Sequence, residues 1–212
     1  MNEVLMQIRK TGIVPVVVLD DAKDTKGLGQ ALIEGGLPCA EVTFRTAAAE
    51  EAIRTMTREF PELLVGAGTV LTMDQAKRAL DAGAKFMVSP GFDPQIVDFC
   101  LENGITITPG VATPTEIIMA MNKGLNVVKF FPAEPLGGLK MIKAIAAAFP
   151  EICFMPTGGI SAKNVGEYLA YDRIAACGGS WMVKKDLIRA GKFDEITAMV
   201  KEAAGIVREV RG

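Results

Sequence analysis

The chain of 212 residues contains no histidine. Histidine is the usual general base beside a catalytic serine or cysteine, so its absence excludes Ser-His-Asp and Cys-His mechanisms. The absence also removes the most common protein ligand of transition metals. Carboxylates alone could hold Mg²⁺, but no motif supports such a site, and we expect no metal or other cofactor. Any catalysis must therefore use lysine, carboxylates, hydroxyls and backbone groups.

Cysteine is scarce, and its four copies are far apart without any C-x-x-C pair. They are Cys39, Cys100, Cys153 and Cys177. Most of them lie in or beside apolar runs, where a free cysteine behaves as a small hydrophobic residue. The pattern therefore predicts reduced thiols with a structural role.

The chain has neither a large excess of positive or negative charge nor a long run of apolar residues. Lysine and arginine number 23 against 25 acidic residues, a net charge of −2, so we expect no nucleic-acid partner. No apolar run approaches the roughly 20 residues of a membrane helix, and Glu3 interrupts any signal-peptide pattern. We therefore expect no membrane partner and a cytoplasmic location. Half of the residues are hydrophobic, enough for a large core.

Short β-branched runs alternate with longer segments of helical periodicity along the chain. The expected strands cover residues 13–19, 39–44, 63–68, 85–89, 105–108, 125–130, 152–156 and 173–177. The expected helices cover residues 24–35, 47–59, 73–82, 93–102, 113–123, 137–148, 161–170 and 191–210. Residues 2–10 predict a short additional helix before the first strand.

Eight strand–helix units favour a parallel sheet with right-handed crossovers, and eight strands can close into a barrel. We therefore predict an α/β fold, a (β/α)8 TIM barrel that forms one domain over residues 1–212. A doubly wound open sheet is the alternative. It is weakened because Leu19, Asp20 and Asp21 follow the first strand where a dinucleotide-binding fold has G-x-G-x-x-G.

Lys129 is a cation inside an apolar run that spans residues 125–132. Burial favours the neutral form of an amine, and a neutral lysine can attack carbonyl carbon to form a Schiff base. The alternative is an amine that extends from the strand end to water. Alternation along the strand directs Lys129 and Val127 into the barrel, while Val128 and Phe130 face the helices.

The second expected strand carries Glu41, Thr43 and Arg45 on one face. Because Val42 and Phe44 suit packing against helices, Glu41 and Arg45 should point into the mouth of the barrel. The alternative is a simple ion pair between them. Buried polar pairs are costly, which favours a functional role.

Several strand exits combine hydroxyls with glycine or proline. Thr69 ends the third unit, and Ser89 with Pro90 ends the fourth; ordinary turn chemistry would explain both. Two glycine pairs, residues 158–159 and 178–179, follow the seventh and eighth expected strands. Barrel enzymes frequently bind phosphate between these two loops, so we expect a phosphate site there.

Seven segments, in order along nearly the whole chain, carry a family resemblance. They are residues 41–45 (EVTFR), 65–70 (VGAGTV), 89–91 (SPG), 109–114 (PGVATP), 129–134 (KFFPAE), 156–161 (PTGGIS) and 178–181 (GGSW). The set resembles the bacterial 2-keto-3-deoxy-6-phosphogluconate (KDPG) aldolases, also called 4-hydroxy-2-oxoglutarate (KHG) aldolases. KFFPAE followed by PTGGIS is its most specific part.

The resemblance implies a class I aldolase on a (β/α)8 barrel, usually a homotrimer, that needs no metal and acts on a 2-oxo acid, commonly phosphorylated. It implies that Lys129 forms the Schiff base and Glu41 transfers protons. The implied pyruvate-end residues are Arg45, Thr69, Ser89 and Pro90, with Phe131 packed nearby. The implied phosphate-end residues are Thr157, Gly158, Gly159, Gly179 and Ser180.

The chain departs from the family pattern beside the mouth. Ala47 replaces a proline common after R-T, Lys184-Lys185 stand where a proline is usual, and Pro135-Leu136 replace smaller residues. These changes leave open the preference among KDPG, its galactonate-derived isomer and 4-hydroxy-2-oxoglutarate. The alternatives to an aldolase are a phosphosugar isomerase without an imine and a non-catalytic phosphosugar-binding protein.

Overall fold

Parallel strands alternate with helices throughout the computed structural model, which describes residues 2–212. The strands are β1 (Ile13–Val17), β2 (Cys39–Thr43), β3 (Leu64–Gly68), β4 (Phe86–Val88), β5 (Thr106–Thr108), β6 (Gly110–Val111), β7 (Val127–Phe130), β8 (Cys153–Pro156) and β9 (Cys177–Gly179). The α-helices are α1 (Glu3–Thr11), α2 (Thr25–Gly35), α3 (Ala49–Glu59), α4 (Met73–Asp81), α5 (Pro94–Glu102), α6 (Pro114–Asn122), α7 (Gly138–Ala146), α8 (Val165–Leu169), α9 (Lys185–Arg189) and α10 (Phe193–Arg211). The 3-10 turns are η1 (Ala22–Asp24) and η2 (Glu134–Leu136).

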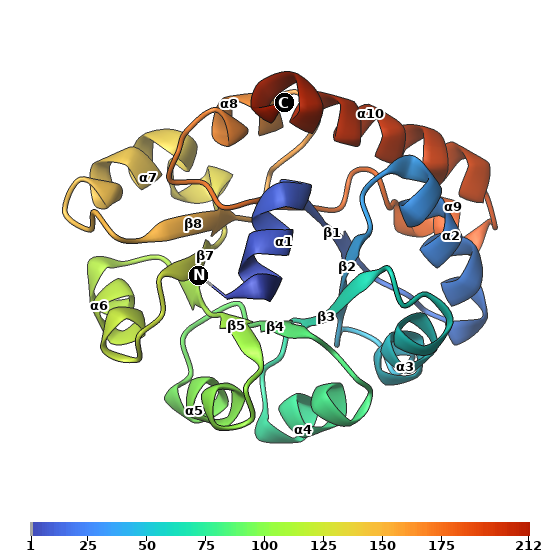
Figure 1. Cartoon of the computed structure of the whole chain (residues 1–212), viewed down its shortest axis with the longest axis horizontal. Coiled ribbons are helices and arrows are strands. Elements are labelled where there is room, and N and C mark those ends of the chain that lie inside the picture. Colours follow the sequence, from blue (N-terminus) through green and yellow to red (C-terminus); the bar gives the residue numbers. More distant parts are fainter. Residues whose placement is uncertain (1) are drawn as a thin grey trace.

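The strands form a curled parallel sheet with helices on its outer side (Figure 1). Six strands pair in the order β5-β4-β3-β2-β1-β9, and three pair in the order β6-β7-β8. Parallel bridges from Phe154 to Ile174 and from Thr157 to Gly178 link β8 to the β9 segment. The predicted α/β class is therefore confirmed. A single sheet of eight strands was expected, but the paired strands form two sheets.

The fifth expected strand, residues 105–108, corresponds to β5, and a further short strand, β6, begins just beyond Pro109. Thr108 pairs with Val88 of β4, and Gly110 pairs with Lys129 of β7. Proline has no N–H to donate, and the Pro109 carbonyl accepts a hydrogen bond from the Lys129 N–H at 2.9 Å. The chain therefore leaves one sheet and enters the other at this residue.

The eighth strand is displaced from its expected position. It covers Cys177–Gly179 and pairs with β1, so the prediction of 173–177 and of a Gly178-Gly179 loop behind it was wrong. A Cβ at Gly178 would lie 2.2 Å from Thr157 Oγ1, and one at Gly179 would lie 1.9 Å from the Trp181 ring. Because these glycines lack a Cβ, the Thr157 and Trp181 side chains can pack directly against the strand. Glycine at these two positions therefore reflects close packing within a strand.

Most helix boundaries follow the expected signals. The side chains of Thr72, Asp93 and Thr113 cap the N-termini of α4, α5 and α6. Helix α8 is shorter than the expected 161–170. Asn164 accepts from the Ser161 N–H at 2.8 Å and so holds a turn ahead of the helix. Strand β6 and helix α9 were not expected.

Two apolar layers lie on either side of the sheet. The outer layer packs the sheet against the helices and includes Val128 and Phe130, while Val127 belongs to the inner layer, as the alternation predicted. Helix α1 lies across the centre of the curled sheet (Figure 1) and contributes Leu5 and Ile8 to the inner layer. The amino-terminal end of the interior is therefore covered by apolar side chains. Among residues 2–212, no helix combines the length and apolar character needed to cross a membrane.

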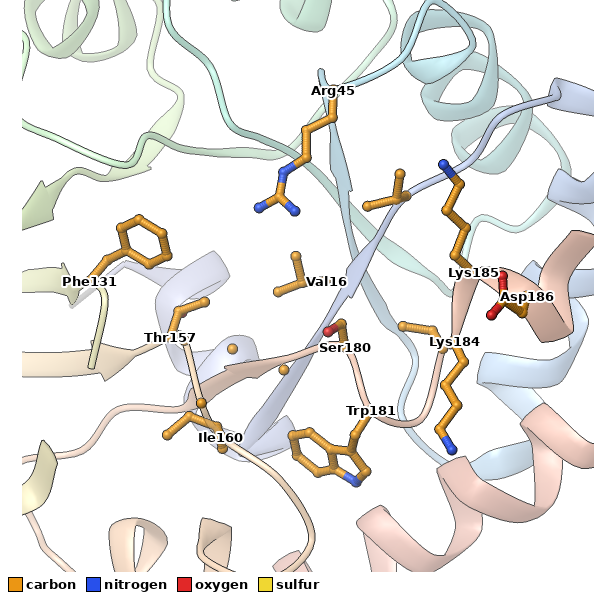
Figure 2. A pocket seen from close by; sticks show the side chains of 16 residues that line it. Val16, Arg45, Phe131, Thr157, Ile160, Ser180, Trp181, Lys184, Lys185 and Asp186 are labelled. Atoms are coloured by element: carbon orange, nitrogen blue, oxygen red, sulfur yellow. The ribbon is translucent and has the colours of Figure 1, made fainter. Parts of the chain in front are cut away.

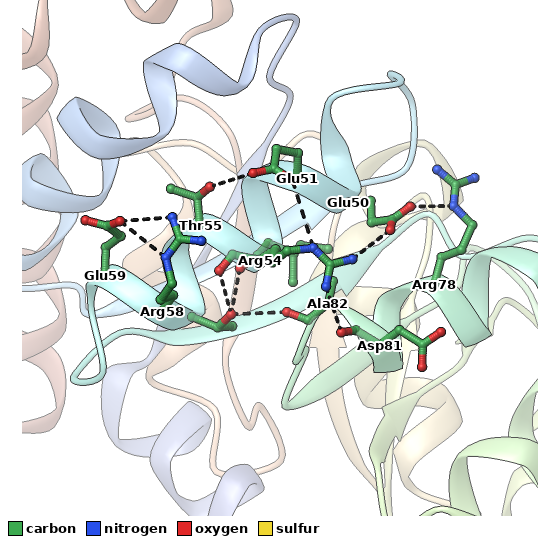
Figure 3. A network of polar contacts seen from close by, with 11 residues as sticks. Glu50, Glu51, Arg54, Thr55, Arg58, Glu59, Arg78, Asp81 and Ala82 are labelled. Atoms are coloured by element: carbon green, nitrogen blue, oxygen red, sulfur yellow. Dashed lines mark hydrogen bonds and ion pairs between the residues drawn. The ribbon is translucent and has the colours of Figure 1, made fainter.

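A network of ion pairs joins α3 to α4 (Figure 3). Glu50 accepts from Arg54 Nη2 at 2.8 Å and from Arg78 Nε at 2.7 Å. The Arg78 guanidinium also lies over the Phe44 ring, 5.6 Å from its centroid. The network therefore supports the segment that follows β2. The hydrogen bond from Arg78, with help from Arg54, holds the pKa of the Glu50 carboxyl below its usual range.

Replacing Glu50 with glutamine should destabilise the protein modestly at neutral pH, by about 0.5 kcal/mol, because the pairs are partly solvated. Because the pKa of Glu50 is lower in the folded protein, its ion pairs add their full stabilisation above the pKa of an unfolded-state glutamate, about 4.3. This stabilisation is lost as the pH falls through the pKa of Glu50 in the folded protein. The difference in free energy of unfolding should therefore shrink in acid. Urea titrations of wild type, Glu50→Gln and the exposed control Glu102→Gln at several pH values would measure it. A difference that persists unchanged in acid would contradict the ion-pair explanation.

Candidate active site

Glu41 on β2 and Lys129 on β7 form a buried ion pair. Their exposed fractions are 0% and 3%, and Glu41 Oε1 lies 3.6 Å from Lys129 Nζ. Within residues 2–212, neither Glu41 carboxylate oxygen accepts a hydrogen bond. A buried carboxylate without hydrogen bonds is costly, and such a group is retained where a ligand or reaction uses it. The inward parity predicted for both side chains is confirmed.

The third strand makes room for the Glu41 side chain. Glu41 pairs with Gly66, and Gly68 lies two residues further along β3. A Cβ at Gly68 would stand 2.2 Å from Glu41 Oε1, so even alanine would displace the carboxylate. Thr43, on the same face of β2, donates its hydroxyl to the Val17 carbonyl at 2.8 Å. Thr43 thus holds β2 to β1, and Glu41 is left as the unsatisfied group of this strand.

Lys129 is fixed by its backbone and bordered by an aromatic ring. Its N–H donates to the Pro109 carbonyl, and its Nζ lies 5.0 Å from the centroid of the Phe131 ring. A ring face attracts a cation and, being apolar, also limits water around the amine. Phe131 lines the adjoining cavity, which places the Lys129 amine beside that space.

A cavity of about 480 Å³ opens at the carboxyl ends of the strands (Figure 2). Seven of the predicted site residues line it, namely Arg45, Phe131, Thr157, Gly158, Gly159, Gly179 and Ser180. Its size falls within the range of small-molecule sites. Arg45 and Phe131 of the predicted pyruvate end thus share one space with the five residues of the predicted phosphate end, whereas Glu41, Lys129 and Thr69 lie outside its lining.

Arg45 and Thr69 form one end of this region. The Arg45 side chain points into the cavity (Figure 2), and its Nε donates to Thr69 Oγ1 at 3.3 Å. Thr69 has a φ of 55°, a left-handed conformation that threonine rarely adopts. Such strain in a non-glycine residue often accompanies function. Thr69 therefore reaches the cavity through its contact with Arg45.

Ser89 and Pro90 lie outside the set of residues that line the cavity. The Ser89 hydroxyl donates to the Gly91 carbonyl at 2.7 Å. The Pro90 carbonyl lies against Gly110, where a Cβ would stand 2.1 Å from its oxygen. These contacts shape the exit of β4 against β6, and a role in substrate binding stays a prediction.

Nine further residues line the cavity, namely Val16, Val18, Ile160, Gly178, Trp181, Val183, Lys184, Lys185 and Asp186. The sequence had placed Gly178 in an expected phosphate loop and Lys184-Lys185 beside the mouth, and the others were not predicted as site residues. The departure of Lys184-Lys185 from the family pattern was the available signal. Lys185 pairs with Asp20 at 2.8 Å. Thr108 was also missed. Its hydroxyl and that of Thr157 are buried and make no hydrogen bond within residues 2–212.

All four cysteines are free, as predicted. Burial, together with the negative charge of Glu41, raises the pKa of the Cys39 thiol well above its usual range. Burial raises the pKa values of Cys100 and Cys177 to about 12. These three thiols therefore stay protonated at neutral pH and are poor nucleophiles. Within residues 2–212, no cluster of three or more His, Cys, Asp or Glu side chains is placed to hold a metal ion.

Comparison with known proteins identifies the family. The family model "KDPG and KHG aldolase" matches residues 4–199. The chain belongs to this family. It is 49% identical over 200 residues to the 2-dehydro-3-deoxy-phosphogluconate aldolase of Treponema pallidum, covering 94% of this chain and 95% of that protein. It is 42% identical over 191 residues to the KHG/KDPG aldolase of Escherichia coli, covering 90% of each.

Solved structures of KDPG aldolases have the same architecture. The enzyme of Legionella pneumophila, with pyruvate captured as a covalent carbinolamine, superposes with a TM-score of 0.91 at 37% identity, covering 94% of this chain and 97% of that one. The Zymomonas mobilis enzyme with 3-phosphoglycerate gives 0.89 at 38% identity, covering 97% of each chain. The predicted resemblance to the KDPG and KHG aldolases is confirmed.

Proposed function

We propose that this protein is a class I aldolase that cleaves 2-dehydro-3-deoxy-6-phosphogluconate to pyruvate and glyceraldehyde 3-phosphate. It also cleaves 4-hydroxy-2-oxoglutarate to pyruvate and glyoxylate. The observation that carries the proposal is the buried pair of Lys129 and Glu41, beside a Phe131 ring that lines the cavity, in a chain of this family. The covalent pyruvate adduct in the Legionella relative supports imine chemistry for this chain.

Lys129 supplies the covalent step. Glu41 takes the ammonium proton of Lys129, and the neutral Nζ adds to the C2 ketone of the substrate. Return of that proton to the carbinolamine hydroxyl lets it leave as water, which gives the protonated imine. The imine accepts the electron pair of the C3–C4 bond as that bond breaks, which leaves an enamine of pyruvate. Protonation at C3 restores the imine, and water then hydrolyses it to pyruvate and the free amine.

Glu41 moves the protons of this sequence. Cleavage requires a base for the C4 hydroxyl proton, and the later enamine requires an acid at C3. Glu41 lies 3.6 Å from the amine, and neither of its oxygens is occupied by a hydrogen bond within residues 2–212. It takes the first proton and returns it at C3, directly or through a water molecule. One carboxylate therefore serves both halves of the reaction.

The other predicted site residues orient the substrate. The planar guanidinium of Arg45, held by Thr69, suits the substrate carboxylate, with Ser89 and Pro90 shaping that end. Gly158 and Gly159 with Thr157, and Gly179 with Ser180, form the phosphate end, where glycine lets backbone N–H groups approach an anion.

We also infer that the two sheets close into one (β/α)8 barrel that forms a single domain over residues 1–212. The continuity of β5 and β6 on either side of Pro109 supports closure on one side. The bridges of Phe154 and Thr157 support it on the other. The family resemblance supports a homotrimer and a cytoplasmic location. The exposed apolar side chains Ile118, Met119 and Met121 of α6 offer a surface for such an assembly.

Borohydride trapping tests the imine directly. Reduction in the presence of pyruvate, followed by peptide mass mapping, should modify the peptide that contains Lys129. The exposed Lys140 of α7 should stay unmodified and serves as an internal control. An unmodified Lys129 peptide would refute the Schiff-base assignment. Turnover of substrates with and without phosphate, compared side by side, would establish the substrate preference.

A further inference from the structure

The segment after β7 and the loop after β8 are joined beyond the ends of their strands. The pairing of Phe130 with Pro156 closes the regular ladder. The Ala133 N–H then donates to the Thr157 carbonyl at 2.8 Å, and the Glu134 N–H donates to the Gly158 carbonyl at 3.0 Å. The short segment 129–134 therefore connects Lys129 to the Gly158-Gly159 loop.

The Glu134 side chain lies directly against Gly159. A Cβ at Gly159 would stand 2.6 Å from both Cβ and Cγ of Glu134, and Gly159 has a φ of +81°. Glycine is thus required at this position for two independent reasons. The contact holds the exposed Glu134 against the loop.

Tyr168 fixes the Glu134 carboxylate in turn. The Tyr168 side chain is 2% exposed, and its hydroxyl donates to Glu134 Oε1. A Cβ at Gly138 would stand 2.8 Å from the Tyr168 hydroxyl and 2.7 Å from the same Glu134 oxygen, so glycine makes room for the pair. Burial, and then the Glu134 carboxylate, raises the pKa of Tyr168 well above its usual range, which keeps the hydroxyl a donor.

Asn164 holds the same loop from its other side. Its Nδ2 donates to the Gly159 carbonyl at 3.0 Å, and its Oδ1 accepts from the Ser161 N–H at 2.8 Å. Within residues 2–212, the N–H groups of Gly158 and Gly159 donate to no acceptor, and both glycines line the cavity. The loop is therefore held through its carbonyl groups and its contact with the Glu134 side chain. Its backbone N–H groups stay available to bind an anion.

We propose that Glu134 and Tyr168 are positioning residues, which hold the Gly158-Gly159 loop at a set distance from Lys129 and so give the protein its preference for phosphorylated over unphosphorylated 2-oxo acids. The inference rests on the proposed aldolase function. A preorganised set of donors binds an anion better than a mobile one, because the ordering cost has already been met in folding. The pair touches neither the amine nor Glu41, so its loss weakens phosphate binding and leaves imine chemistry intact.

Removal of the Tyr168 hydroxyl tests the pair with little change in volume. Tyr168→Phe should raise KM for the phosphorylated six-carbon substrate about tenfold, the effect of losing one hydrogen bond to a charged group. kcat for that substrate should change less than KM. Both constants for unphosphorylated 4-hydroxy-2-oxoglutarate should change by less than about twofold, because that substrate has no phosphate for the loop.

Two further variants and a control sharpen the test. Glu134→Ala should reproduce the effect of Tyr168→Phe, and Glu134→Gln, which keeps an acceptor oxygen, should show a smaller rise in KM. Tyr171→Phe changes the chain's other tyrosine, which faces Lys143 at 5.4 Å, and should leave both substrates unaffected. Thermal unfolding of each variant would detect a general loss of stability.

The outcomes separate this inference from the proposed function. An equal loss with both substrates, or an unchanged KM for the phosphorylated one, would overturn the positioning role. A wild-type protein that fails to trap pyruvate on Lys129 would overturn the aldolase function instead. Retained trapping in Tyr168→Phe, together with the selective rise in KM, would support both.

Discussion

Replacing Lys129 with alanine should lower kcat by a factor on the order of 10⁴ or more, the usual scale for loss of a covalent nucleophile. Without the amine no imine forms, and the C3–C4 electrons have no cationic nitrogen to accept them. Lys129→Arg should be almost as inactive, because a guanidinium stays protonated and cannot add to a ketone. The rate of pyruvate release from the phosphorylated substrate would measure the activity of both variants. Their comparison distinguishes a need for the nucleophilic amine from a need for a positive charge at residue 129.

Loss of the amine also affects folding. Lys129→Ala leaves Glu41 buried without its counter-charge, and breaking a buried pair costs about 3–5 kcal/mol. Lys129→Met, which preserves the volume, and the double variant Lys129→Met with Glu41→Gln would control for this loss. Any folded Lys129 variant that retained more than a few per cent of wild-type turnover would contradict a covalent role.

Replacing Glu41 with glutamine should separate imine formation from proton transfer. The amide has the shape of the carboxylate and fits the space left by Gly68, so the fold should persist. The variant should still trap pyruvate on Lys129 after borohydride reduction. Its kcat should fall by about 10²–10⁴, the range expected for loss of a general acid–base group.

Solvent exchange gives a direct measure of the Glu41 step. Wild-type protein incubated with pyruvate in D2O should exchange the pyruvate methyl protons, because enamine formation is reversible, and NMR would follow the signal loss. Glu41→Gln should lose this exchange in proportion to kcat. Wild-type rates of exchange in a variant that still forms the imine would assign the proton transfer to another group.

The regular parts of the fold could be predicted from the sequence. Alternation along residues 125–130 placed Lys129 inside and Phe130 outside, because side chains on a strand point to opposite faces. Thr113 followed by Pro114 marked the start of α6, because its hydroxyl caps the helix. These signals are local, and each rests on a few neighbouring residues.

The features that failed depend on contacts distant in sequence. Gly178 read as a loop residue, but it pairs with Val14 of β1 and so lies in β9, a contact distant in sequence. The pairing of Tyr168 with Glu134 leaves no local pattern in either segment. Lys184 and Lys185 stood out as departures beside the mouth and do line the cavity, but the helix α9 that begins there was not expected.

Helix α1 closes one end of the sheet interior. Because Leu5 and Ile8 fill the amino-terminal end, we expect substrate, water and products to pass through the cavity at the carboxyl ends of the strands. In the proposed mechanism pyruvate stays attached to Lys129 until the imine is hydrolysed, so the aldehyde leaves first and pyruvate follows through the same opening.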